Sequence, residues 1–182
     1  RIDSRVGRLL NLLEETGRLE NTVIVYTSDH GEMHGHHGFW GKGLTAYEDC
    51  QRVPLLVWSP GRHWRQGQQD AIVNLVDLPR FFLSLAGLEV PQGLQGADLL
   101  PFLDGGAAPR RGTIIESHIT SKIYQQTYVN TRCKIVIYDR EDWGELYDLQ
   151  EDPHQYHTQS LGQRRNAATQ AITRDASATY DG

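Results

Sequence analysis

The sequence predicts an α/β fold: a mixed or parallel sheet with flanking helices, followed by a small antiparallel β-sheet subdomain. In the first half of the chain, an amphipathic helical pattern leads into a run of β-branched residues, and a second apolar run follows. Such runs without polar alternation are typical of strands covered on both faces, as in parallel sheets. After residue 112 the apolar segments become short and are separated by turn residues, which is typical of an antiparallel meander.

The first elements follow from spacing. Apolar residues recur at helical intervals at the start of the chain, at Ile2, Val6, Leu9, Leu10 and Leu13. Gly17 follows them, where glycine commonly ends a helix. The run Val-Ile-Val-Tyr-Thr at 23–27 then predicts a buried strand, and Leu-Leu-Val-Trp at 55–58 predicts a second.

The rest of the chain divides near residues 105–112. Asp77 is placed to cap a helix that Gly87 ends, and a surface loop with a short apolar turn follows. We expect the α/β part to cover residues 1–108, the antiparallel subdomain 109–160, and a polar tail 161–182 with a weak helix. The subdomain strands are predicted at 113–116, 123–129, 133–138 and 145–149.

Composition excludes several classes of protein. Hydrophobic residues make up 38% of the 182 residues, enough for a packed core, and no apolar run is long enough to span a membrane. A net charge of -5 without a long basic run argues against a nucleic-acid partner. Cys50 and Cys133 lie in no CxxC pair and are expected to be free thiols.

The start of the chain indicates a longer protein. Its one methionine is Met33, and Arg1 opens directly on the helical pattern. We therefore expect the N-terminal half of the same protein to precede this chain. A signal peptide cannot be judged on this basis, and the sequence leaves the cellular location unknown.

A loop over residues 28–46 is the strongest candidate for chemistry. It leaves the end of a predicted buried strand, where ligands bind in open α/β sheets, and holds four of the eight histidines within residues 30–37. Asp29 and His30 form a carboxylate–imidazole pair that suits a hard or borderline divalent cation. Neighbouring side chains reach one ion only where the backbone turns, which Gly31 permits.

Lys42 lies at the far end of this loop, where its ammonium group could bind an oxyanion such as sulfate or phosphate and stabilise charge on it. Each of these residues also has a plain structural interpretation. The Asp-His pair can be a hydrogen-bonded turn, and His34, His36, His37 and Lys42 can face water. The residue types alone leave both interpretations open, and further metal ligands would have to come from elsewhere.

Ordered motifs over roughly residues 5 to 157 resemble the sulfatase family of the alkaline phosphatase superfamily. The motifs are NTVIVYTSDHGE at 21–32, HGFWGK at 37–42, RVPLLV at 52–57, SPG at 59–61, VDLP at 76–79, LAG at 85–87 and ELYDLQEDP at 145–153. The resemblance implies the C-terminal part of an alkaline-phosphatase-like sheet and a sulfuric ester hydrolase. Its substrate would be a small-molecule or saccharide sulfate ester.

The same resemblance implies roles for three residues. Asp29 and His30 match metal ligands, and Lys42 matches a catalytic lysine that also binds the substrate. Apart from the resemblance, Glu32 and His37 in the same loop are candidates to support the metal ligands. The Asp-His pair resembles the branch of iduronate sulfatases, choline sulfatases and phosphonate monoester hydrolases. The expected cation is calcium, with manganese as the alternative because an imidazole replaces an amide oxygen.

The family's nucleophile, a formylglycine made in a Cys/Ser-x-Pro-x-Arg motif, has no match at Cys50 or Cys133. We expect it in the part of the protein that precedes this chain, so the chain alone should be inactive. Three alternatives stay open: a phosphonate monoester or phosphodiester hydrolase, a relative whose chemistry has decayed, and a non-catalytic module whose histidines bind zinc or nickel. Trp64 is expected to be the most exposed tryptophan, and His118 and Tyr124 to lie near the pocket rim.

Overall fold

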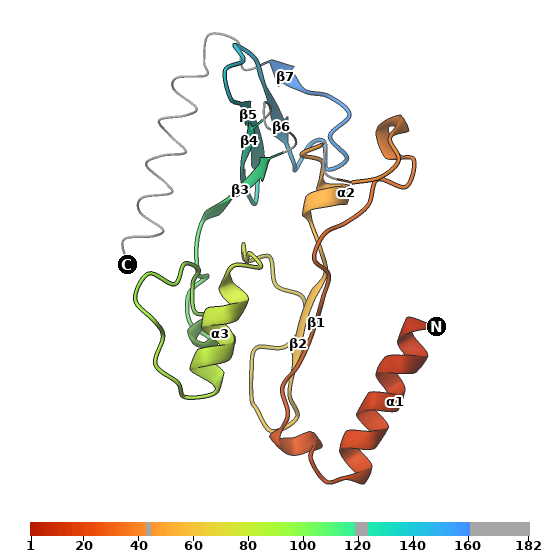
Figure 1. Ribbon diagram of the computed structural model, residues 1–182, viewed down its shortest axis with the longest axis vertical. Helices are drawn as coiled ribbons and strands as arrows, with labels where there is room; N and C mark the ends of the chain where they lie inside the picture. The colour runs from red at the N-terminus through yellow and green to blue at the C-terminus, as the bar shows by residue number, and fades with distance from the viewer. Residues whose placement is uncertain (43–44, 119–123, 161–182) are drawn as a thin grey trace.

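The computed structural model describes residues 1–42, 45–118 and 124–160 and confirms an α/β fold with an antiparallel sheet (Figure 1). The predicted tail at 161–182 and its helix lie outside these residues. The α/β part contains α1 (Ile2–Glu15), η1 (Leu19–Asn21), β1 (Ile24–Thr27), η2 (His36–Gly38), α2 (Glu48–Gln51), β2 (Leu55–Trp58), α3 (Asp77–Leu85) and α4 (Leu100–Leu103). The second part contains β3 (Gly112–His118), β4 (Tyr124–Asn130), β5 (Cys133–Tyr138), β6 (Gly144–Asp148) and β7 (Gln159–Ser160).

The pairing of β1 with β2 differs from the parallel arrangement that their composition favours. The two strands are antiparallel, with Thr27 opposite Leu55, because the loop and α2 return the chain at the strand end where it left. One face of the pair packs into the core through Val25 and Val57. On the other face Leu56 is 58% exposed, so only one face is covered by the described residues.

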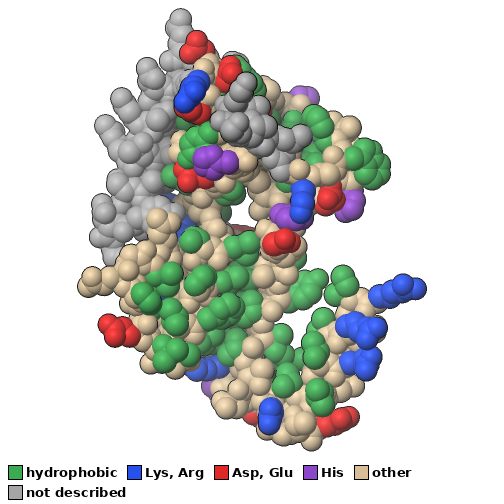
Figure 2. Space-filling view, viewed as in Figure 1, with side chains coloured by type: hydrophobic (Ala, Val, Ile, Leu, Met, Phe, Trp, Pro, Cys, Tyr) green, Lys and Arg blue, Asp and Glu red, His purple; other side chains and the backbone are tan. Residues whose placement is uncertain are grey.

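The core of the α/β part forms around Trp64, Phe81 and Leu99, beneath α3. The prediction that Trp64 is the most exposed tryptophan is wrong, since its side chain is 6% exposed and its ring lies 6.3 Å from that of Phe81. The polar stretch that contains Trp64 lies against α4, because the Arg65 N–H donates to Leu103 O at 2.8 Å, at the end of that helix. Figure 2 shows hydrophobic side chains gathered over this half of the molecule.

The helix ends follow the prediction, although α1 packs differently from an ordinary surface helix. Gly17 and Gly87 adopt positive φ angles of 66° and 65° just after α1 and α3. No residue of α1 is buried, and Leu9 on its apolar side is 63% exposed. In Figure 1 the helix stands beside β1, away from the rest of the chain. Among the described residues, no helix is both long and apolar enough to cross a membrane.

Asp77 does not act as the predicted cap. It is the first residue of α3, and Val76 before it makes no side-chain capping bond. Its fully buried carboxylate accepts hydrogen bonds from the backbone N–H groups of Asn74 at 2.7 Å and Ala97 at 2.8 Å. Both terminal nitrogens of Arg110 also donate to it. The ion pair joins the start of α3 to the segment that enters β3.

The second part is a sheet of order β3-β4-β5-β6-β7 in which every pairing is antiparallel. The predicted boundary at residues 105–112 falls between α4 and β3. The inner face of this sheet buries Val136 and Tyr147 against Ala46, which belongs to the candidate functional loop. The sheet therefore packs directly against the loop.

Replacing Arg110 by alanine should test how much the buried ion pair contributes. The Asp77 carboxylate would stay buried without its countercharge, so we expect the free energy of unfolding to fall by about 3–5 kcal/mol in urea denaturation. Arg111→Ala is the control, because this neighbouring side chain is exposed and should change stability by less than about 0.5 kcal/mol. Equal effects of the two substitutions would contradict the role of the pair.

Candidate active site

The candidate site begins where β1 ends. Asp29 lies two residues beyond the strand, and its side chain is 84% exposed. One carboxylate oxygen accepts the His30 N–H at 3.0 Å, and the other lies 3.4 Å from His30 Nε2. The two neighbouring side chains therefore converge, as the predicted cation site requires.

One hydrogen bond of His30 places a proton on its Nδ1. Its Nδ1 lies 2.8 Å from the carbonyl oxygen of Gly31, which can only accept, so Nδ1 carries the proton. In the neutral ring, Nε2 then holds a lone pair, the form in which an imidazole binds a metal ion. That lone pair points to the space shared by Asp29 and Lys42.

Lys42 reaches His30 because the loop doubles back. The N–H of Met33 donates to Gly41 O at 3.2 Å, and the N–H of Gly35 donates to Phe39 O at 2.9 Å. These bonds pair the outgoing and returning segments, and Lys42 follows directly. Its Nζ contacts His30 Nε2, twelve residues away in the sequence.

The charges around Asp29 favour its ionised form. Partial desolvation raises its pKa, but the His30 ring when protonated, the backbone N–H groups and Lys42 lower it more, so the net pKa lies below the ordinary value. A carboxylate that stays ionised beside an imidazole lone pair provides two donors of the kind that a divalent cation accepts. No group of three or more potential ligands from His, Cys, Asp and Glu lies together within residues 1–42, 45–118 and 124–160. The described residues thus bring together two candidate ligands for a cation, Asp29 and His30.

Gly31 has a different role from the one expected. Its φ is not positive, so the turn does not depend on the conformational freedom of glycine. A Cβ at this position would lie 1.8 Å from the carbonyl oxygen of Asp49, and the Gly31 N–H donates to Cys50 O at 2.8 Å. Glycine is needed because the strand end lies directly on α2.

The other predicted loop residues lie in different surroundings. Glu32 is half-buried and His34 is exposed. His36 Nδ1 lies 2.9 Å from a carboxylate oxygen of Asp49. The His37 ring stacks on Tyr47 with a centroid distance of 3.9 Å, on the side of the loop that faces the antiparallel sheet. Beyond the loop, the rings of His118 and Tyr124 lie 4.6 Å apart.

Sequence reasoning missed the buried lysine beneath the loop. Lys134 of β5 is fully buried, and its Nζ lies 2.5 Å from a Glu48 oxygen and donates to Ala46 O at 2.6 Å. Glu48 therefore pairs with a lysine that lies 86 residues away in the sequence. Desolvation lowers the pKa of Lys134, although the charge of Glu48 opposes this shift. The one signal in the sequence was the alternation of β5, which puts Lys134 on the same face as buried Val136.

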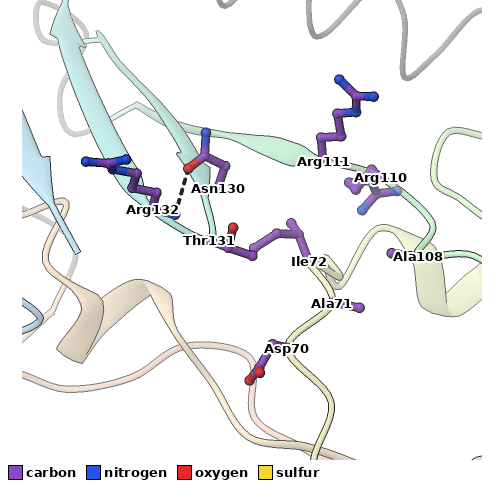
Figure 3. Close-up of a pocket in the computed structure, with 9 residues that line it drawn as sticks. All are labelled: Asp70, Ala71, Ile72, Ala108, Arg110, Arg111, Asn130, Thr131 and Arg132. Carbon is purple, nitrogen blue, oxygen red and sulfur yellow. Dashed lines mark hydrogen bonds between the residues drawn. The ribbon is translucent and has the colours of Figure 1, made fainter. Parts of the chain in front are cut away.

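An open pocket of about 350 Å³ lies apart from these residues, between the segment before α3, the segment that enters β3 and the β4–β5 turn (Figure 3). Arg110, Arg111 and Arg132 are among its lining residues, and Asp29, His30 and Lys42 are not. In Figure 3, the Arg111 side chain points away from Asp70. The pocket contributes nothing to the candidate site.

In fold, the chain is of the alkaline-phosphatase type. It aligns with a phosphonate monoester hydrolase from Silicibacter pomeroyi at a TM-score of 0.78 and 27% identity, over 95% of this chain and 37% of that one. It also aligns with a protein solved in complex with its substrate D-glucosamine-2-N,6-O-disulfate, at a TM-score of 0.76 and 31% identity, over 99% of this chain and 39% of that one.

Sequence comparison gives the family. Residues 1–88 match the family model described as Sulfatase. The chain is 37% identical over 164 residues to an N-acetylglucosamine-6-O-sulfatase of Bacteroides thetaiotaomicron, covering 85% of this chain and 29% of that protein. Arylsulfatase K of Gallus gallus is 42% identical over 113 residues, covering 60% of this chain and 21% of that protein. The chain belongs to the sulfatase family and spans less than a third of the length of these relatives.

Gly31→Ala should test the close contact between the strand end and α2. The added Cβ would collide with Asp49 O, so α2 or the strand end must shift, and we expect a loss of about 1–3 kcal/mol in the free energy of unfolding. Gly7→Ala is the matched control, because nothing lies within 4 Å of its Cβ position inside α1. There alanine should stabilise the helix by up to about 1 kcal/mol. A neutral Gly31→Ala would contradict the contact.

Proposed function

We propose that this chain is part of a metal-dependent sulfuric ester hydrolase in which Asp29 and His30 bind a divalent cation and Lys42 binds the sulfate group. The observation that carries the proposal is the convergence of these three side chains at the end of β1. The family assignment supports it, since the Sulfatase family model matches residues 1–88, which include Asp29, His30 and Lys42. Activity belongs to the complete protein, which supplies the formylglycine nucleophile and the further metal ligands.

The three side chains have separate tasks in this proposal. A bound divalent cation would supply positive charge that polarises the sulfate ester. Asp29 holds its charge because its pKa is lowered, and His30 presents Nε2 because Gly31 O fixes the Nδ1 proton. Lys42, at the end of the doubled-back loop, places an ammonium group where it stabilises negative charge on the transferred group and the ester oxygen.

The cation in this proposal is calcium, with manganese as the alternative. An Asp-His pair provides one hard oxygen donor and one imidazole nitrogen, and nitrogen donors suit manganese better than calcium. This pair also underlies the proposed placement in the branch with iduronate sulfatases, choline sulfatases and phosphonate monoester hydrolases. Metal analysis of the complete enzyme, purified without added ions, distinguishes the two cations.

Substitutions at the site should abolish turnover of sulfate esters by the complete enzyme. We expect Lys42→Ala to lower kcat by about 10²–10³, since it removes a charge that acts on the transition state. Asp29→Ala should lower both kcat and the bound metal content. His34→Ala is the control because its side chain is exposed, and it should leave both unchanged. Loss of metal on His34→Ala, with turnover unaffected by Lys42→Ala, would instead favour the zinc- or nickel-binding module.

A phosphonate monoester hydrolase is the second candidate, because one such enzyme, at 27% identity, is among the aligned structures. The substrate in our proposal is a sulfated saccharide, in keeping with the amino-sugar sulfates named for two of the relatives. We expect kcat/KM of the complete enzyme to be highest for a saccharide sulfate when saccharide sulfates, aryl sulfates and phosphonate monoesters are compared. A clear preference for phosphonate monoesters would contradict the sulfatase assignment.

A further inference from the structure

The segment after β6 closes over the tip of the candidate site loop. We call the contact between His37, Tyr47, His154 and Tyr156 the His37 clasp. The His37 ring lies parallel to Tyr47, with centroids 3.9 Å apart and an interplanar angle of 4°. Its Nε2 donates to His154 O at 2.9 Å, and the Tyr156 ring lies 5.0 Å away. Residues more than a hundred positions apart in the sequence thus hold one imidazole on two sides.

The clasp is itself fixed to buried structure. Gln155 is 2% exposed, and its side-chain oxygen accepts the Glu48 N–H at 2.7 Å. Asp152 accepts the N–H groups of Tyr156 at 3.1 Å and His157 at 2.7 Å, which shapes the turn. Because Glu48 also pairs with buried Lys134, the segment 154–156 is connected through Glu48 to strand β5 beneath the loop.

The loop connects the clasp to Lys42. His37 lies in η2, between the segments that the Met33–Gly41 and Gly35–Phe39 backbone bonds hold together. Lys42 directly follows the returning segment. A displacement of the tip therefore moves the backbone that carries the Lys42 ammonium group. Apart from these bonds, the exposed returning segment, in which Trp40 is 81% exposed, has little packing to hold it.

We propose that His37 is a positioning residue that holds Lys42 beside the Asp29–His30 pair through the clasp, so that the antiparallel sheet contributes to the geometry of the site. The inference rests on the proposed function, in which Lys42 acts on the sulfate group. It gives His37 a mechanical task at the loop tip, distinct from the support of metal ligands that the sequence suggested. A misplacement of a catalytic group by about 1 Å can cost a hundredfold in rate, so such a task has a measurable effect.

A double-mutant cycle in the complete enzyme tests this coupling. We expect His37→Ala to lower kcat for a sulfate ester by about ten- to a hundredfold with KM changed less than about threefold. In a Lys42→Ala background the same substitution should have almost no further effect, because its action runs through Lys42. Additive effects would overturn the inference. An unchanged kcat in Lys42→Ala alone would contradict the proposed role of Lys42, and the inference that depends on that role would be overturned too.

Conservative variants separate the hydrogen bond from the backbone. His37 has a positive φ of 53°, which asparagine tolerates well. His37→Gln can extend an amide N–H to His154 O, whereas the shorter amide of His37→Asn cannot. We expect the Gln variant to retain more kcat than the Asn variant. The reverse order would contradict the clasp, and the exposed His34→Ala serves as the unaffected control.

Amine labelling gives a readout that does not depend on turnover. Acetylation of the complete enzyme, followed by peptide mapping, measures the reactivity of each lysine. Lys42 should label several-fold faster in His37→Ala than in the wild type, since the clasp no longer holds the loop segment that carries it, while buried Lys134 should stay protected. An unchanged Lys42 rate, or a parallel rise at Lys134 that shows general loosening, would overturn the inference.

Discussion

The buried ion pair between Asp77 and Arg110 is the interaction on which the arrangement of the two parts depends. Asp77 opens α3 and Arg110 precedes β3, so a bidentate contact fixes the sheet to the helix that covers the α/β core. A buried ion pair adds little stability over apolar packing, but removing one partner is costly because the other charge stays buried. The two elements meet in a geometry that satisfies both charges, and a shift of either element would leave a buried charge without its partner.

A second ion pair, between Lys134 and Glu48, joins two elements in the same way beneath the candidate site. Lys134 reaches from β5 to Glu48 and to the carbonyl oxygen of Ala46, and burial of its ammonium group is tolerated because both partners are fixed. Its lowered pKa records the cost of that burial. Since α2 also receives the backbone of Gly31, the strand end that carries Asp29 and His30 rests on an element held from below by the sheet. The sheet therefore supports the candidate site through α2.

Local pattern predicted the elements well because each depends on neighbouring residues. The span of α1, the glycine that ends it, the strands β1 and β2 and the four longer strands of the second sheet follow from spacing and turn residues. What depends on distant partners was not predictable. The partners of Asp77 and Glu48 lie 33 and 86 residues away, and the burial of Trp64 follows from a backbone bond to Leu103. The antiparallel pairing of β1 with β2 depends on where the loop returns, which no strand composition encodes.

The candidate site shows the same limit in its histidines. Four within eight residues suggest a cluster, yet the loop doubles back and its backbone adopts positive φ at His34 and His37. The rings consequently point to separate partners: His30 to Asp29 and Lys42, His36 to Asp49, and His37 to Tyr47. Histidines that are close together in the sequence therefore do not form one cluster in the structure. Motif resemblance could select Asp29, His30 and Lys42 among the polar residues of the loop. Only the fold gives roles to two of the other imidazoles, because His36 and His37 attach the loop to its surroundings.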